Sequence, residues 1–354
     1  MKTEHILVIR FSAMGDVAMT VPVVYSLARQ YPQLRITVLS QKFARPFFDH
    51  MPHNVGFMEA DIKSEYRGVS GLNSLYRRLM AKNFTAIADL HSVLRSRYLR
   101  LRFNLDRYRV AHIDKHREAR RRLTAQNGKL LEQIPTSFQN YADVFAALGY
   151  PVKLEFTSIF PEGKGDLGTL PEGLRNKAAG DTWIGIAPFA AHTGKTYPAD
   201  RMERVIQLIA GRHPGSRFFL FGGGTEEKEK MDEWCARNPK AENASALLGG
   251  IAEELTLISH LDVMVSMDSS NMHLASLTGT PVVSVWGATH PFAGFMGWGQ
   301  DSSNAVQIDL PCRPCSVYGQ KPCLRGNYPC MTGITPEMIA DRVDIQLMRG
   351  KRKE

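Results

Sequence analysis

The residues best suited to bind a charged ligand are Asp268, Ser269 and Ser270, which follow directly on the apolar residues 263–265. A helical pattern begins there and ends before Pro281. The first turn of a helix carries unpaired N–H groups and the positive end of the helix dipole, and both attract phosphate. A turn of this kind after a parallel strand is where open α/β sheets bind ligands. The pattern therefore predicts a phosphate site, with an ordinary N-capping turn as the alternative.

The apolar runs and helical periodicities around this turn predict two α/β halves. Residues 161–173, rich in glycine and proline, separate them. A chain of 354 residues is long for one core, so we predict two doubly wound α/β domains that face a cleft. Strands are expected at residues 6–9, 36–39, 86–90, 183–187, 218–221, 263–265 and 282–286, and helices at 17–31, 140–149, 201–213 and 336–347.

The positive charge of the chain is concentrated in one segment. The net charge is +9, and residues 95–122 contribute eleven basic and only three acidic side chains. Such a segment attracts a polyanion, which can be nucleic acid, anionic lipid headgroups or a phosphorylated substrate. The alternative is a solvated helix face, because arginine also packs and pairs with neighbours.

Four of the five cysteines, at positions 312, 315, 323 and 330, lie close together. One C-x-x-C pair with two further cysteines is compatible with bound zinc or with iron and sulfur. The second pair lacks the close spacing of a zinc ribbon, however, and no histidine lies inside the cluster. Plain thiols in a surface loop and a redox-sensitive clasp are favoured over a metal site, and no metal is expected.

Several nucleotide-binding signatures are absent. Phe189 stands where a Walker A loop ending in Gly194-Lys195-Thr196 needs its first glycine. Glu227 stands where the glycine run at 222–224 needs a third glycine to be a dinucleotide fingerprint. No Asp-x-Asp pair of the kind that holds a metal on a nucleotide diphosphate is present. These absences argue against ATP hydrolysis and hydride transfer.

The sequence also bears on location. No apolar run approaches the ~18 residues needed to cross a bilayer. The first residues carry an acid and lack the long apolar region and cleavage site of a signal peptide. We therefore expect a cytoplasmic protein.

Three short segments and the cysteine-rich tail carry a family resemblance. Residues 12–16 read Ser-Ala-Met-Gly-Asp, residues 195–198 read Lys-Thr-Tyr-Pro, and residues 268–274 read Asp-Ser-Ser-Asn-Met-His-Leu. In this order and spacing they resemble the S-x-M-G-D, K-x-W-P and D-[TS]-G-x-x-H motifs of glycosyltransferase family 9, the lipopolysaccharide heptosyltransferases. Three positions depart from the family pattern: Ser270 replaces glycine, Tyr197 replaces tryptophan, and His91 replaces glutamine.

The resemblance implies a GT-B fold, in which two Rossmann-like domains face a central cleft. It implies that residues 1–165 bind the acceptor and residues 166–335 bind the nucleotide sugar, followed by a helix and a basic tail at 336–354. It further implies an inverting transfer that uses no metal ion or other cofactor. The expected reaction moves heptose from ADP-heptose to the inner core of lipopolysaccharide.

The resemblance also implies roles for individual residues. Asp16 is expected to be the catalytic base, and Lys195 the cation that meets the departing diphosphate. A plain helix cap for Asp16 and a buried core position for His273 are the alternatives. The residues expected to bind the donor are Thr193, Gly194, Glu226, Glu227, Gly249, Ile251, Asp268, Ser269, Ser270 and His273. The residues expected to bind the acceptor are Arg10, Ser12, Met14, Gly15, His91 and Arg95.

The resemblance also implies a partner for the basic segment, the lipopolysaccharide core, because that core is anionic. We expect peripheral contact with the cytoplasmic face of the inner membrane, and no nucleic-acid partner. Within the same fold, another nucleotide sugar could serve a different surface glycan. A basic nucleic-acid-binding protein would be a different class of function. It is disfavoured because it leaves Asp16, Lys195 and Asp268 without a role. A catalytically silent sensor of nucleotide sugars is a further alternative.

Overall fold

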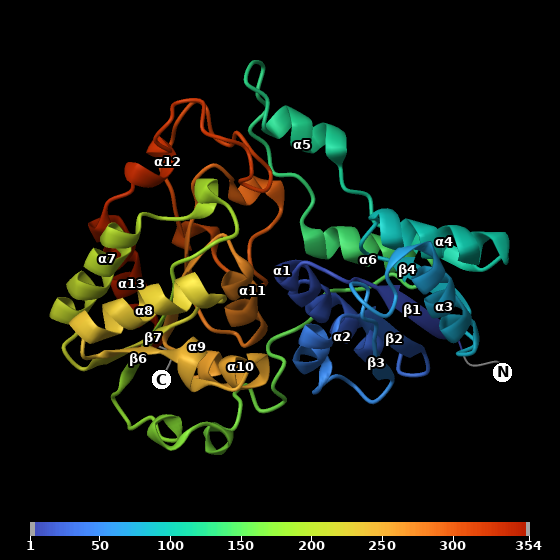
Figure 1. Ribbon diagram of the computed structural model, residues 1–354, viewed down its shortest axis with the longest axis horizontal. Helices are drawn as coiled ribbons and strands as arrows, with labels where there is room; N and C mark the ends of the chain where they lie inside the picture. Colours follow the sequence, from blue (N-terminus) through green and yellow to red (C-terminus); the bar gives the residue numbers. More distant parts are fainter. Residues whose placement is uncertain (1–3, 352–354) are drawn as a thin grey trace. The chain divides into compact units, whose positions relative to one another are not determined.

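A five-stranded parallel sheet forms the first of two compact units in the computed structural model, which describes residues 4–351 (Figure 1). Its strand order is β3-β2-β1-β4-β5. The order reverses between β1 and β4, and in open α/β sheets the ligand crevice lies at such a reversal. The strands are β1 (His5–Ile9), β2 (Arg35–Ser40), β3 (Val55–Glu59), β4 (Ala86–Asp89) and β5 (Arg109–His112).

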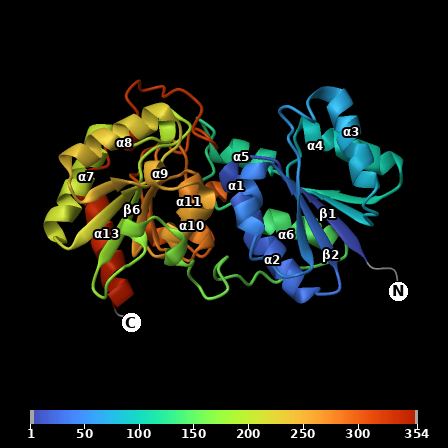
Figure 2. The same ribbon diagram turned by 60° about the horizontal axis from the view of Figure 1, so that its bottom comes forward.

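Helices cover both faces of this sheet, as Figure 2 shows. The helices α3 and α4 pack on one face, where Leu7 and Ile9 of β1 meet Leu79 and Phe103 in a buried cluster. The helices α2 and α6 lie together on the other face. The first unit also includes the turn η1 (Lys42–Phe48) and ends at Ile159. Its helices are α1 (Met14–Ala18), α2 (Thr20–Gln30), α3 (Gly68–Met80), α4 (Leu94–Leu105) and α6 (Ser137–Ala147).

The second unit contains a six-stranded parallel sheet in the order β11-β10-β9-β6-β7-β8. This is the doubly wound order that the strand–helix alternation predicts, and its reversal lies between β6 and β9. The central strands β6 and β9 are almost entirely buried. The strands are β6 (Thr182–Ala187), β7 (Ser216–Leu220), β8 (Ala241–Asn243), β9 (Val263–Met267), β10 (Val282–Val285) and β11 (Ala305–Val306).

The helices of the second unit enclose its sheet. The last helix, α13, packs along α7 and against β9, β10 and β11. The 116–134 segment also belongs to this unit, because Arg120 donates to the Tyr318 hydroxyl at 2.6 Å and the Ile134 amide donates to the Phe292 carbonyl at 3.0 Å. The helices are α5 (Arg117–Leu123), α7 (Ala199–Arg212), α8 (Thr225–Arg237), α9 (Ala244–Leu247), α10 (Ile251–Ser259), α11 (Ser270–Leu277), α12 (Pro329–Thr332) and α13 (Pro336–Lys351).

Two predictions about the local structure need correction. The single helix expected at 17–31 is two helices, α1 and α2, separated at Met19. Pro22 has no N–H to donate to the carbonyl of Ala18, so the helix restarts. The basic segment 95–122 is divided, since it runs from the first unit into the second.

The last three residues of the expected helix and basic tail at 336–354 lie outside the described residues. None of the helices between residues 4 and 351 is long and apolar enough to span a bilayer.

Candidate functional site

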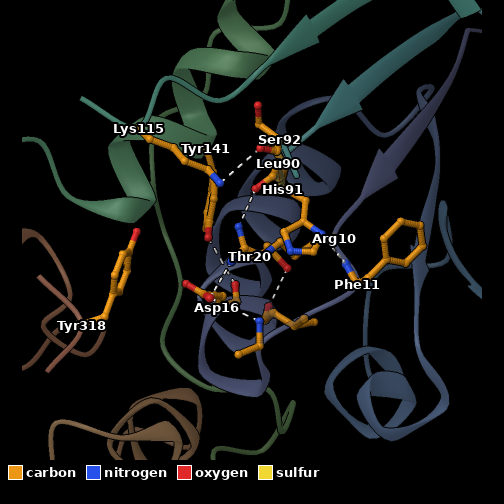
Figure 3. A network of polar contacts seen from close by, with 12 residues as sticks. Arg10, Phe11, Asp16, Thr20, Leu90, His91, Ser92, Lys115, Tyr141 and Tyr318 are labelled. Atoms are coloured by element: carbon orange, nitrogen blue, oxygen red, sulfur yellow. Dashed lines mark hydrogen bonds and ion pairs between the residues drawn. The ribbon is translucent and has the colours of Figure 1, made fainter. Parts of the chain in front are cut away.

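The loops at the reversal point of the first sheet are joined by Arg10 (Figure 3). Arg10 follows β1, and its Nη1 donates to the carbonyl of Leu90, after β4, at 2.7 Å. Its Nη2 lies 2.6 Å from Oδ2 of Asp16 in α1. The same Asp16 oxygen accepts a hydrogen bond from the amide of Ala13 at 3.2 Å. Arg10 thereby fixes both the distance between the two loops and the position of the Asp16 carboxylate.

The two members of this ion pair differ in exposure. The Arg10 side chain is 7% exposed, whereas that of Asp16 is 31% exposed. The carboxylate is therefore oriented by a nearly buried cation but can still be reached by a ligand. The hydroxyl of Tyr141, on α6, donates to the backbone carbonyl of Asp16 at 3.3 Å and holds the helix turn in place.

His91 lies beside this pair and is buried. The amide of Phe11 points toward its Nδ1 at 3.5 Å, a long contact. Burial, with the charge of Arg10 as the next cause, lowers the pKa of His91 to about 3. The imidazole is therefore neutral near neutral pH, and it can accept or donate a hydrogen bond without adding charge to the site.

Asp89, which the sequence reasoning did not single out, organises the loop that carries His91. Its fully buried carboxylate accepts from the amides of His91 at 3.0 Å and Ser92 at 2.8 Å. It also forms an ion pair with Arg100 at 3.2 Å. The only signal in the sequence is an acidic residue at the end of an apolar strand.

The other residues expected to bind the acceptor lie on the same two loops or next to them. Ser12 is in the loop before Asp16, and Met14 and Gly15 open α1. Arg95 lies in the first turn of α4, exposed, and its charge is among those that lower the pKa of His91. All the first-unit residues expected in the site thus gather at the reversal between β1 and β4.

In the second unit, the loops after β6 and β9 are joined by Lys195 and Asp268. Nζ of Lys195 lies 3.1 Å from Oδ2 of Asp268. The same oxygen accepts from the Thr289 hydroxyl at 2.8 Å. Asp268 is almost buried, and the Lys195 side chain is 17% exposed. The carboxylate therefore holds the lysine, and the ammonium is the partly accessible charge.

The Lys195 loop is packed without spare room. The amide of Ala288 donates to the carbonyl of Gly194 at 2.8 Å, and a Cβ on Gly194 would lie 2.8 Å from the Gly319 carbonyl. A Cβ on Gly319 would come within 2.5 Å of Cγ of Lys195. The lysine stem therefore lies on the backbone of the loop that contains the cysteines.

Arg313, also absent from the predicted site, ties that loop to the end of β10. It is 5% exposed, and its Nη2 donates to the carbonyls of Trp286 at 3.2 Å and Thr289 at 3.0 Å. Its other nitrogens donate to the carbonyls of Gly287 and Ile308. Nothing near Arg313 in the sequence indicates these partners.

The turn after β9 is a helix start without a side-chain cap. Ser269 is the N-cap residue of α11, but its hydroxyl forms no capping hydrogen bond and lies 3.3 Å from that of Ser266. Ser269 and Ser270 are half-buried, and His273 is buried one turn further along. The Ser269 side chain therefore does not cap α11, contrary to the N-capping alternative. Thr193 lies in the short turn Thr193–Lys195 that carries the lysine.

The remaining residues expected to bind the donor lie at the ends of β7 and α9. Glu227 accepts from the amide of Gly223 at 2.7 Å, whereas Glu226 is exposed in the first turn of α8. The amide of Gly249 donates to Glu253 at 2.8 Å, and Ile251 opens α10. Among residues 4–351, no hydrogen bond or ion pair connects Glu226, Glu227, Gly249 or Ile251 with Lys195 or Asp268. Of the two glutamates, Glu226 is the one not engaged by its own loop.

The cysteines are free thiols, and Cys330 is buried. Burial raises the pKa of the Cys330 thiol to about 11 and that of Cys315 above its usual value. In the part of the chain that the structure describes, no group of three or more His, Cys, Asp or Glu side chains is arranged to hold a metal ion.

Comparisons with known proteins identify the family of the chain. The profile of glycosyltransferase family 9 (heptosyltransferase) matches residues 72–323. The Campylobacter jejuni lipooligosaccharide heptosyltransferase 2 is 22% identical, with 93% of this chain and 95% of the relative aligned. The Pseudomonas aeruginosa lipopolysaccharide heptosyltransferase 1 is 24% identical, with 97% and 98% aligned.

Solved structures share the fold. A glycosyl transferase family 9 protein from Veillonella parvula superposes with a TM-score of 0.72 at 19% identity, covering 99% of this chain and 98% of its own. The E. coli heptosyltransferase WaaC with ADP superposes with a TM-score of 0.67 at 17% identity, covering 97% and 99%. The predicted GT-B class, two doubly wound α/β units, is confirmed.

Replacing His91 with glutamine should make the protein less sensitive to acid. The pKa of this histidine falls from 6.5 to about 3 on folding. The unfolded chain therefore binds a proton in that range that the folded chain does not. Stability should fall as the pH drops below 6.5, and His91→Gln should remove that part of the loss. Urea titrations at about pH 7.5, 6.5 and 5.5 measure the free energy of unfolding.

The matched control is His53→Gln, because His53 is exposed. That variant should follow the wild-type pH dependence. Parallel curves for the wild type and His91→Gln would contradict a histidine that stays neutral in the fold.

Proposed function

The chain belongs to glycosyltransferase family 9, and on this premise we propose that it transfers heptose from ADP-heptose to the inner core of lipopolysaccharide. The proposed transfer inverts the anomeric centre and needs no metal ion. The observation that carries this proposal is the Asp16 carboxylate, held by the nearly buried Arg10 and still open to a ligand. Such a carboxylate suits a general base that acts on a sugar hydroxyl.

In the proposed step, the acceptor hydroxyl oxygen attacks the anomeric carbon of the heptose. Asp16 takes the hydroxyl proton as the new C–O bond forms. The bond between the anomeric carbon and the diphosphate oxygen breaks, and its electron pair leaves with ADP. Attack opposite the leaving group inverts the configuration, so one step and one carboxylate are enough.

The charge that develops on the departing diphosphate needs a positive partner. Lys195 supplies an ammonium group, and the first-turn amides of α11 add N–H donors. Supporting this, Asp268 holds the lysine in one place before any ligand arrives, and the Thr289 hydroxyl in turn donates to the Asp268 carboxylate. A fixed cation of this kind can take over the role that a metal ion plays in transferases with an Asp-x-Asp pair.

We assign the acceptor to the first unit and the donor to the second. Arg10, Ser12, Met14, Gly15, His91 and Arg95 would contact the acceptor, and the positive charges suit an anionic lipopolysaccharide core. Glu226 is the carboxylate available to a ribose hydroxyl, and Gly249 and Ile251 would border the base. The relatives named above are lipooligosaccharide and lipopolysaccharide heptosyltransferases, and one related structure contains ADP, which supports this assignment. We further propose peripheral contact with the cytoplasmic face of the inner membrane, where such an acceptor is anchored.

The proposal is tested by incubating the purified protein with ADP-heptose and heptose-deficient lipopolysaccharide in EDTA. We expect the acceptor to gain one heptose by mass spectrometry and to carry the anomeric configuration opposite to that of the donor. Transfer from a UDP- or GDP-sugar instead would agree with glycosyltransferase activity but refute ADP-heptose as the donor. Activity that disappears in EDTA and returns with a divalent metal would refute the metal-independent step.

Asp16→Asn should lose ~10²–10⁴-fold in kcat while it keeps its affinity for ADP, because the amide cannot accept the proton. The control is Asp143→Asn, which changes an exposed carboxylate on α6 of the same unit. Turnover of Asp16→Asn within about threefold of the wild type would contradict the general-base role.

Gly319→Ala should weaken ADP binding by roughly tenfold or more, since its Cβ would displace the Lys195 side chain. Gly326→Ala is the matched control: the two glycines have φ of +80° and +84°, but a Cβ on Gly326 meets nothing within 4 Å. Both variants should lose about 1–2 kcal/mol of stability from the left-handed backbone, and only Gly319→Ala should lose affinity. Calorimetric titration with ADP measures the difference, and equal affinities would contradict the role of Lys195 as the phosphate cation.

A further inference from the structure

The solvent-facing side of α4 carries a stripe of exposed leucines. Leu94 is 86% exposed, Leu101 55% and Leu105 69%. On a helix with 3.6 residues per turn, these three positions lie within about 40° of one another. Three of the ten large hydrophobic side chains exposed among the described residues are therefore on one face of one helix.

This stripe is not part of the core. The opposite face of α4 supplies Ser96, Leu99 and Phe103 to the interior, and Phe103 packs against Tyr76 and Tyr108 at 4.9 and 5.1 Å between ring centroids. The helix thus has one apolar face that is buried and a second that is not. An apolar stripe of this kind on a soluble fold indicates an interaction surface.

Exposed arginines border the leucine stripe. Arg95 and Arg97 on α4 and Arg107 just beyond it are all exposed, and no residue between 4 and 351 forms an ion pair with them. Arg100 and Arg102 differ, because the first pairs with Asp89 and the second lies over the Tyr76 ring at 4.5 Å. Among the described arginines of α4 and Arg107 just beyond it, those outside any ion pair or ring contact are therefore the ones that flank the leucines.

We propose that this face of α4 docks on the surface of an anionic lipid bilayer, with Leu94, Leu101 and Leu105 among the acyl chains and Arg97 and Arg107 at the headgroups. Leucines flanked by arginines are the pattern of a helix that lies in a membrane interface, where basic side chains reach the phosphates while the apolar face is buried. The positive charge of the arginines distinguishes between two binding partners for this face. A second copy of this chain would bring like charges together, whereas the headgroups of an anionic bilayer pair with the arginines.

The position of α4 indicates what the proposed membrane contact would do. The helix begins three residues after His91, so its N-terminal end lies at the proposed acceptor loops. A helix rises 1.5 Å per residue, so Leu105 lies only about 16 Å along the axis from Leu94. This inference rests on the proposed function for its purpose, which is to hold those loops near a lipid-anchored acceptor.

The test is co-sedimentation of the full chain with vesicles of phosphatidylcholine, with and without about one-third phosphatidylglycerol. No nucleotide or acceptor is added, so the result does not depend on transferase activity. The wild type should bind the anionic vesicles and release them at high salt. Leu101→Ser/Leu105→Ser should bind at least ~10-fold more weakly. The control is Leu324→Ser, which changes a leucine that is 80% exposed in the second unit.

The charge is tested separately with Arg97→Gln/Arg107→Gln, which should lose the preference for anionic vesicles. Arg325→Gln, exposed beside Leu324, is its control. Turnover of both double variants on a detergent-solubilised acceptor should equal that of the wild type. Wild-type protein that ignores anionic vesicles, or leucine variants that bind them as the wild type does, would overturn the proposal. So would leucine variants that change the oligomeric state of the protein without lipid, since a second copy would then be the occupant.

Discussion

The second unit is arranged around the buried carboxylate of Asp268. Leaving a buried charge unpaired costs about 3–5 kcal/mol, so this carboxylate requires the Lys195 ammonium and the Thr289 hydroxyl that meet it. The loop that carries Lys195 lies against the chain at Ala288 and Gly319. Arg313 in turn holds that part of the chain to the end of β10. One carboxylate thus accounts for the placement of three loops and of the cation that we assign to the diphosphate.

The first unit uses the same device with the charges exchanged. There the nearly buried member is the cation Arg10, and the accessible member is the carboxylate of Asp16. In both units the pair lies where the strand order reverses. Lys195 and Asp268 come from the loops after β6 and β9, whereas Arg10 and Asp16 both follow β1, and Arg10 reaches the loop after β4 through the Leu90 carbonyl. The exposed partner is negative in one unit and positive in the other. This difference matches a base for the acceptor and a cation for the leaving group.

The core of each sheet could be predicted from the sequence, and its edges could not. Central strands such as β1 and β9 are buried on both faces, so they read as unbroken apolar runs. The strands without a clear signal are β3, β5, β8 and β11, which are the four edges of the two sheets. Their composition is mixed because one flank faces solvent, as in β5, where only Ala111 is buried.

In the candidate site, too, some features could be predicted from the sequence and others could not. Asp16, Lys195 and Asp268 lie in local motifs and could be singled out. The pairing of Lys195 with Asp268 could not be predicted, because it depends on which strands are neighbours in the sheet. Arg313 acts through hydrogen bonds and Gly319 through packing, both with distant parts of the sequence, and neither leaves a local pattern.

We propose that the second unit binds an adenine nucleotide diphosphate by fixed protein charges alone. Calorimetric titration of the wild-type protein with ADP, UDP and GDP, each in EDTA, tests it most directly. We expect selective binding of ADP that EDTA leaves unchanged. Binding that prefers UDP or GDP, or that appears only when a divalent metal is added, would contradict it.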